Sequence, residues 1–196
     1  MKLIFASQNL GKVKEVKGIF LNTPFEIVSL YDLGNNINVK ETGSTFSENA
    51  FLKAKAVYDI YKEPVIADDS GLMIEQLNGK PGVFSARYAG ENCSYRDNNL
   101  KVISELRNLP EPHRAKFVCV SLFLDGNEKI ETIGELVGVI IKEERGSGGF
   151  GYDPIFIPDG FSKTIAELSF EEKNKISHRA KSFNKLKNIL IEKFFC

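Results

Sequence analysis

The sequence predicts an α/β protein with mixed α+β character, built on a mixed β-sheet. Short apolar runs alternate with helix-length amphipathic segments, one pair of runs is joined by a hairpin signal, and polar, glycine-rich segments follow the strands. Alternating strands and helices are typical of a sheet covered by helices, and the hairpin adds an antiparallel pair. In such proteins, polar segments at strand ends are where sites form.

Apolar runs and helical spacing predict the elements of the first half of the chain. Thr45 and Glu48 have the spacing of a capping box, which marks a helix start. Pro64 ends that helix, and a short strand then runs into a turn-rich tip at residues 68–71. The expected elements are strands over 2–6, 25–30, 65–67 and 72–77, and helices over 9–21 (with Val13, Val16, Ile19 and Phe20 on one side) and 44–61.

The second half of the chain is read in the same way. A helix over 94–109 places Leu100, Ile103 and Leu106 on one face. Residues 117–124 are apolar on both faces, which predicts a central, buried strand. Residues 125–127 are a hairpin signal, so the run to Ile141 should be its antiparallel partner. A glycine-rich loop at 146–151 and a last helix from about Ser177 complete the chain.

Composition excludes several classes of protein. Lys plus Arg and Asp plus Glu each number 26, and this balance argues against coating nucleic acid or an anionic membrane. The three cysteines form no CxxC pair, so a disulfide framework or structural zinc is not expected, and Cys119 should be buried. No apolar run approaches the roughly 20 residues of a membrane span. We therefore expect a soluble, cytoplasmic protein that binds neither nucleic acid nor membrane.

The segment from Ser7 to Lys12 links a strand to a helix start. Helix N-termini offer unpaired N–H groups and a positive dipole end, which together bind phosphate. Asn9 can donate from its amide, and Lys12 can reach a phosphate oxygen as a point charge. The alternative is an ordinary helix cap with a solvated lysine. The segment is not a P-loop, so its local pattern alone favours that alternative.

Four acidic residues are candidate metal ligands. Mg²⁺ prefers oxygen ligands, usually one or two carboxylates with phosphate and water. Asp68 and Asp69 follow an apolar strand, and we favour a metal-binding role for them over a solvated turn. Glu48 is accounted for by the capping box, whereas the local pattern leaves Glu41 open.

The glycine-rich loop and the start of the last helix are the remaining candidates. Gly146, Gly148 and Gly151 match GxGxxG, but an extended, proline-broken segment follows, so we reject a dinucleotide fold. Phe150 or Tyr152 can stack on a nucleobase, worth about 1–3 kcal/mol, or can equally fill the core. His178 and Arg179 form a donor-rich corner or a solvated helix start. His113, in a proline-rich connector, is expected to be exposed.

Together and in this order, these segments resemble one family, the inosine triphosphate pyrophosphatases. The matching stretches are residues 7–12, 41–50, 67–72, 81–88, 148–154 and 172–179. The resemblance implies a long mixed sheet forming two lobes around a central nucleotide-binding cleft, within one domain over residues 1–196. It also implies a homodimer.

The implied activity is Mg²⁺-dependent hydrolysis of non-standard purine nucleoside triphosphates (ITP, dITP, XTP) to the monophosphate and pyrophosphate. Glu41 and Asp69 would hold Mg²⁺, and Asp69 would also be the base. The substrate contacts implied by the resemblance are Ser7, Gln8, Asn9, Leu10, Gly11, Lys12, Ser70, Phe150, Gly151, Tyr152, Asp153, Lys173, His178 and Arg179.

The choice of base has a physical rationale. Arg179 and Lys173 are donors without acceptor capacity, so they match the 6-oxo group of hypoxanthine or xanthine and not the 6-amino group of adenine. Such a mismatch can reject the wrong base by roughly 10⁴-fold. Two alternatives remain: a Maf-like pyrophosphatase acting on modified pyrimidine or methylated nucleotides, and a nucleotide-binding module without turnover.

Overall fold

The computed structural model describes residues 1–35 and 37–196, and within them six strands form one mixed sheet in the order β2-β1-β3-β4-β5-β6. β1 (Lys2–Phe5) pairs in parallel with β2 (Glu26–Ser29) and with β3 (Val65–Ile74). β5 (Lys129–Ile140) pairs antiparallel with β6 (Phe156–Pro158). The predicted class, an α/β protein with a mixed sheet, is confirmed.

The chain divides into two compact units, and three strands, β3, β4 (His113–Leu124) and β5, contribute residues to both. The first unit consists of Met1–Asp69, Cys119–Gly134 and His178–Cys196. The second unit consists of Ser70–Val118 and Glu135–Ser177.

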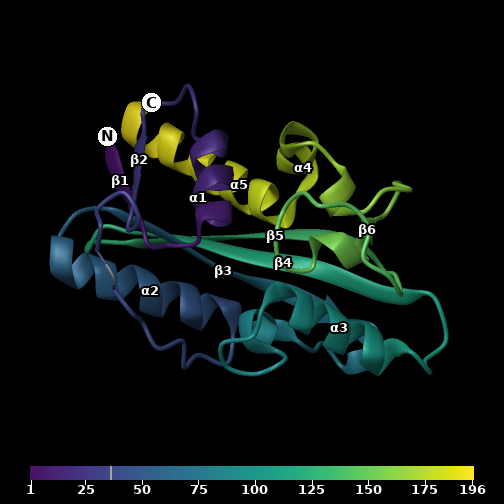
Figure 1. Cartoon of the computed structure of the whole chain (residues 1–196). Coiled ribbons are helices and arrows are strands. Elements are labelled where there is room, and N and C mark those ends of the chain that lie inside the picture. The colour runs from purple at the N-terminus through teal and green to yellow at the C-terminus, as the bar shows by residue number, and fades with distance from the viewer. Residues whose placement is uncertain (36) are drawn as a thin grey trace. The chain divides into compact units, whose positions relative to one another are not determined.

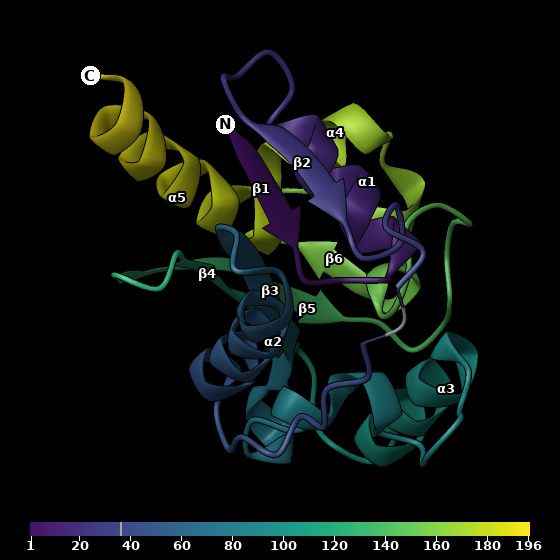
Figure 2. The same ribbon diagram turned by 90° about the vertical axis from the view of Figure 1, so that its left-hand side faces the viewer.

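The first unit has helices on both faces of its part of the sheet. α1 (Leu10–Ile19) and α5 (His178–Phe195) contact each other on one face, and α2 (Phe46–Tyr61) covers the other (Figures 1 and 2). Successive side chains of β1 alternate between the two faces, so Leu3 packs with α1 and α5 while Ile4 packs with α2. Each face therefore has its own apolar cluster. Val13, Val16, Ile19 and Phe20 are all buried, as predicted.

The second unit has its own apolar cluster, built around β3, β4 and β5 with α3 (Tyr95–Leu106). The α3 helix begins at a capping box between Ser94 and Asp97. Its inner face carries Val102 and Leu106, whereas Leu100 is 49% exposed, so the prediction for Leu100 was wrong. The buried face of α3 also includes Asn98 and Asn99, so it is rotated away from Leu100 relative to the predicted face. A short helix that we did not predict, α4 (Phe170–Ile176), precedes α5.

β3 corrects the prediction of a turn-rich tip at residues 68–71. The strand runs without a break through both aspartates to Ile74, and a short 3-10 helix over Glu75–Leu77 follows. Asp has a low intrinsic preference for strands, but that preference is weak and context overrides it. Here the context consists of cations that neutralise the buried carboxylates and of a side-chain amide that donates a hydrogen bond to one of them, as described below.

The remaining strand predictions have mixed outcomes. β4 is buried along most of its length, as predicted, and its turn to β5 is closed by Asp125 Oδ1, which accepts from the backbone N–H groups of Asn127 and Glu128. Neighbouring strands joined by so short a turn run antiparallel.

His113, expected to be exposed in a connector, is 1% exposed and is the first residue of β4. Its Nε2 lies 3.2 Å from the carbonyl oxygen of Leu109, which gives the buried ring a polar partner.

None of the helices among residues 1–35 and 37–196 is long and apolar enough to cross a membrane.

Candidate active site

The two adjacent aspartates of β3 have different partners. Asp68 contacts side chains from α1 and α5, and Asp69 contacts side chains from α2. Because neighbouring residues of a strand point to opposite faces of the sheet, one strand supplies a carboxylate to each side. The first unit therefore contains two separate charged clusters.

The first of these, which we call the Asp68 network, consists of Lys12, Glu15, Asp68 and Arg179. Asp68 Oδ2 lies 3.0 Å from Lys12 Nζ and 3.1 Å from Arg179 Nη2. Arg179 Nη1 lies 2.6 Å from Glu15 Oε2, and the side chains of Glu15, Asp68 and Arg179 are almost fully buried. Two cations thus face two anions, the arrangement that makes buried charges tolerable.

The charges of this network determine the ionisation of Asp68. Burial alone would raise the pKa of Asp68, but Lys12 and Arg179 outweigh burial and hold it well below its usual range. Cys119 Sγ lies 3.8 Å from Asp68 Oδ2. Burial raises the pKa of the Cys119 thiol, so this cysteine is a neutral, buried side chain, as predicted, and not a nucleophile.

The second, which we call the carboxylate cluster, consists of Glu41, Asn49, Lys53 and Asp69. Lys53 Nζ lies 2.9 Å from Glu41 Oε1 and 2.8 Å from Asp69 Oδ1. Burial lowers the pKa of Lys53, but the carboxylates, Asp69 first, outweigh it and raise the pKa to about 12. Burial raises the pKa of Asp69, which makes it a stronger base than an ordinary aspartate.

The carboxylate cluster could hold a divalent cation. Two carboxylates converge on one ammonium group, so they already hold a cation, and their charge exceeds that of Lys53 by one. In the described part of the chain, no group of three or more His, Cys, Asp or Glu side chains forms a ready-made metal site. Two carboxylates completed by substrate phosphate and water are the usual protein contribution to a Mg²⁺ site.

The segment from Ser7 to Lys12 forms the start of α1. Asn9 is the helix cap, and its Oδ1 accepts from the backbone N–H of Lys12 at 3.1 Å. Gln8 Nε2 donates to the carbonyl of Asn35 at 3.3 Å, and Leu10 is 56% exposed. The capping alternative for Asn9 is thus confirmed, while Lys12 is not a solvated lysine because it binds Asp68.

In the second unit, the glycine-rich loop is held by Asp153. Asp153 Oδ2 accepts from the backbone N–H of Phe150 at 2.8 Å and from Lys173 Nζ at 2.6 Å. Lys173 Nζ also lies 4.5 Å from the centroid of the Phe150 ring. Gly149 has φ +71°, and a Cβ there would lie 2.0 Å from Asp153 Oδ2, so the position requires glycine. Phe150, Asp153 and Lys173 form one cluster.

The structure distinguishes the two aromatic residues of this loop. Tyr152 is 4% exposed and its hydroxyl donates to the carbonyl of Ser85 at 2.8 Å, so it fills the core. Phe150 is half-buried, and the ring of Tyr95 lies 6.2 Å away at an angle of 42°. Phe150 therefore remains the candidate for stacking on a base.

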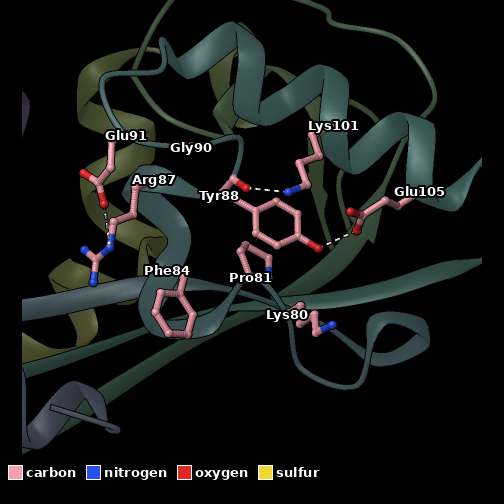
Figure 3. A pocket seen from close by; sticks show the side chains of 9 residues that line it. All are labelled: Lys80, Pro81, Phe84, Arg87, Tyr88, Gly90, Glu91, Lys101 and Glu105. Carbon is pink, nitrogen blue, oxygen red and sulfur yellow. Dashed lines mark hydrogen bonds and ion pairs between the residues drawn. The ribbon is translucent and has the colours of Figure 1, made fainter. Parts of the chain in front are cut away.

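The stretch 81–88 of the second unit connects the core to a pocket. Ser85 Oγ accepts from the backbone N–H of Leu72 at 2.9 Å. In Figure 3, Tyr88 lies between Lys101 and Glu105: its hydroxyl donates to Glu105, and Lys101 Nζ donates to its carbonyl at 2.6 Å. These groups satisfy one another, so we assign no substrate to this pocket of about 530 Å³. Its lining consists of Lys80, Pro81, Phe84, Arg87, Tyr88, Gly90, Glu91, Lys101 and Glu105.

The other predicted contacts follow the chain. His178 is the first residue of α5 and is 5% exposed; it lies in the first unit with Arg179. Ser70 follows Asp69 on β3, and Gly151 lies in the loop with φ +63°.

Sequence reasoning missed Glu15, Asn49 and Lys53. A signal existed for each, because charged and amide residues that fall on the buried stripe of an amphipathic helix need a partner inside the protein. Glu15 lies between the buried residues Val13 and Val16 of α1. Asn49 and Lys53 are one helical turn apart on α2 and therefore share a face.

Comparisons with known proteins agree with this geometry. The Ham1 family model matches residues 3–189. A dITP/XTP pyrophosphatase of Thermoanaerobacter pseudethanolicus is 46% identical over 194 residues, covering 98% of each chain. A dITP/XTP pyrophosphatase of Bacillus subtilis is 48% identical over 189 residues, covering 95% of this chain and 96% of that one. The solved structure of the Staphylococcus aureus Ham1 protein superposes with a TM-score of 0.87 at 42% identity, covering 98% of this chain and 100% of that chain.

Proposed function

Because the chain belongs to the Ham1 family, we propose that it is a nucleoside triphosphate pyrophosphatase that hydrolyses non-standard purine nucleotides such as dITP, XTP and ITP. This is the family that the sequence motifs resemble. The observation that carries the proposal is the pair of carboxylates, Glu41 and Asp69, converging on one cation. A triphosphate needs such a site, because the negative charge of its oxygens hinders the approach of the lone pair of the attacking water.

We assign the triphosphate to residues of the first unit. The start of α1 presents backbone N–H groups, and Lys12 adds a positive charge beside it. Mg²⁺ held by Glu41 and Asp69 would neutralise phosphate charge and help to ionise the attacking water. Asp69 would accept the proton of that water. Attack at the α-phosphorus then releases pyrophosphate and leaves the monophosphate.

We assign the base to Phe150 and Lys173, as the resemblance implies. Phe150 offers a ring for stacking, and Lys173 places a donor beside that ring. A donor without acceptor capacity matches a 6-oxo purine. Arg179 remains a predicted base contact, although its guanidinium binds Asp68 and Glu15 in this structure.

The proposal is tested by pyrophosphate release from ITP, XTP, dITP, ATP, GTP, dUTP, a modified pyrimidine triphosphate and a methylated nucleotide, each with Mg²⁺ and with chelator. We expect metal-dependent turnover that favours ITP, dITP and XTP. Turnover only of modified pyrimidine or methylated nucleotides would favour the Maf-like alternative. Binding of ITP without release of pyrophosphate would favour a non-catalytic module.

Asp69→Asn tests the proposed base and metal ligand. It keeps the shape of the side chain but removes the charge, so turnover should fall by at least about 10³-fold. Circular dichroism of the variant checks that the loss of turnover does not come from unfolding. The matched control is Asp159→Asn, because Asp159 pairs with Arg114 at the surface. Full activity in Asp69→Asn would remove this residue from the mechanism.

We also propose that the protein is a homodimer, as the resemblance implies, and that it is cytoplasmic, as its composition led us to expect. Sedimentation equilibrium at micromolar concentration measures the first, and a monomer at all concentrations would contradict it. Fractionation of cells measures the second.

A further inference from the structure

Asn49 links the two segments that carry the proposed metal ligands. It lies in the first turns of α2 and is fully buried. Its Oδ1 accepts from the backbone N–H of Gly43 at 2.8 Å, and its Nδ2 donates to Asp69 Oδ2 at 3.3 Å. Both ends of one buried amide are therefore used, one on the loop that follows Glu41 and the other on β3.

The hydrogen bond from the Asn49 side-chain amide to Asp69 orients that carboxylate. Asn49 binds Oδ2, which leaves Oδ1 as the oxygen that faces Lys53 Nζ at 2.8 Å. A carboxylate turns about its last torsion with little resistance, so a fixed donor on one oxygen determines where the other points. The oxygen aimed at the cation is thus selected by Asn49.

The hydrogen bond from the backbone of Gly43 to the Asn49 side chain positions the other carboxylate, that of Glu41. Gly43 lies two residues after Glu41, whose Oε1 is 2.9 Å from the same Lys53 Nζ. The packing here is close: a Cβ at Gly43 would lie 2.6 Å from Glu48 Cβ and 2.7 Å from Asn49 Oδ1. The capping box between Thr45 and Glu48 anchors the start of α2 directly beside this contact.

We propose that Asn49 is the positioning residue of the metal site, setting the separation and orientation of Glu41 and Asp69 so that both face one divalent cation. This rests on the proposed function, because it supposes that these two carboxylates hold the metal. An apolar residue of similar size would fill the same space, but it would lose the hydrogen bonds to Gly43 and to Asp69. Partners that orient metal ligands in this way typically change metal affinity or activity by about 10–100-fold when they are removed.

The chain offers a matched control in Asn98, which occupies an equivalent setting in the second unit. Asn98 is 2% exposed on α3, and its Oδ1 accepts from the backbone N–H of Ala89 at 2.7 Å. Its Nδ2 donates to the carbonyl of Ala86 at 3.3 Å. The same substitution at either asparagine removes the hydrogen bonds of a buried side-chain amide, but only Asn49 contacts a proposed metal ligand.

The experiment compares Asn49→Ala and Asn49→Asp with Asn98→Ala and Asn98→Asp. Mn²⁺ binding to the substrate-free protein is titrated by electron paramagnetic resonance, and kcat and KM for ITP are measured at saturating Mg²⁺. Asn49→Ala should weaken Mn²⁺ binding by about tenfold or more, and Asn98→Ala should leave it within about twofold of the unsubstituted protein. Thermal unfolding of all four variants checks that each of them is folded.

Asn49→Asp separates the two hydrogen bonds of the amide. It keeps an acceptor for Gly43 but replaces the donor to Asp69 with a second carboxylate, which repels that oxygen. We therefore expect kcat to fall by about tenfold or more while KM for ITP stays nearly constant. Unchanged Mn²⁺ affinity in Asn49→Ala, together with full kcat in Asn49→Asp, would overturn the inference and leave the proposed function intact. An unsubstituted protein without metal-dependent turnover would overturn both.

Discussion

Glu15→Gln is the substitution that most directly tests the Asp68 network. Glu15 Oε2 lies 2.6 Å from Arg179 Nη1, and the two side chains are 3% and 1% exposed. The glutamine keeps the size of the side chain but removes its charge. Arg179 is then left with Asp68, which also neutralises Lys12.

The expected loss follows from burial of the remaining charge. Removing one partner of a buried ion pair costs about 3–5 kcal/mol. Asp68 stays beside Arg179, so we expect the lower end, about 3 kcal/mol, or roughly 150-fold in the folding equilibrium. For a chain of this length, that corresponds to a drop of about 6–12 °C in Tm.

Urea unfolding at pH 7, followed by circular dichroism, measures the effect. The matched control is Asp59→Asn, because Lys55 Nζ lies 2.6 Å from Asp59 Oδ2 but both side chains are about half exposed. An ion pair that is this exposed should contribute little to stability. If Glu15→Gln loses no more stability than Asp59→Asn, the reasoning about the buried network is wrong.

Two other substitutions test different parts of the first unit. A Cβ at Gly134 would lie 2.2 Å from the carbonyl oxygen of His178, so Gly134→Ala should cost about 2 kcal/mol or more, measured by thermal unfolding. The control is Ile133→Ala, because the neighbouring Ile133 is 49% exposed. A loss of stability in Gly134→Ala no larger than that in Ile133→Ala would contradict the prediction. The hydrogen bond from Lys17 leads the interactions that lower the pKa of Asp32 from 3.8 to about 2. A depressed carboxyl stabilises the fold above its unfolded pKa and loses this effect as pH falls through the folded value. Asp32→Asn should therefore cost about 1 kcal/mol at pH 7, after allowance for solvent screening, and much less near pH 2; urea midpoints that differ equally at both pH values would refute this.

Local patterns predicted the parts of the fold that depend on neighbours in sequence. The capping box of Thr45 and Glu48 and the apolar stripe of α1 are formed by residues within a few positions of one another, and both are present. The buried central strand β4 was also predicted, because its apolar run needs no particular partner. The ordered motifs were sufficient to identify the family, which the comparisons confirm.

The same local reasoning was wrong about Asp68, Leu100 and His113. Residues 68–71 are Asp, Asp, Ser and Gly, all of which are common in turns, and only distant residues make a strand possible there. Arg179 lies 111 positions from Asp68 in sequence, so no local window contains the charge that allows Asp68 to be buried. A helical face, likewise, is chosen by what packs against it, and on α3 buried Asn98 and Asn99 take part in that choice.

The sequence by itself determined which chemical groups are present, in what order, and on which kind of element. The tertiary structure decided which of them meet: the pleat of β3 directs Asp68 to α1 and α5 and Asp69 to α2, and α2 adds Lys53 and Asn49. The physical reason is that a carboxylate can be buried only where folding brings a cation or a donor to it, and those partners come from remote parts of the chain.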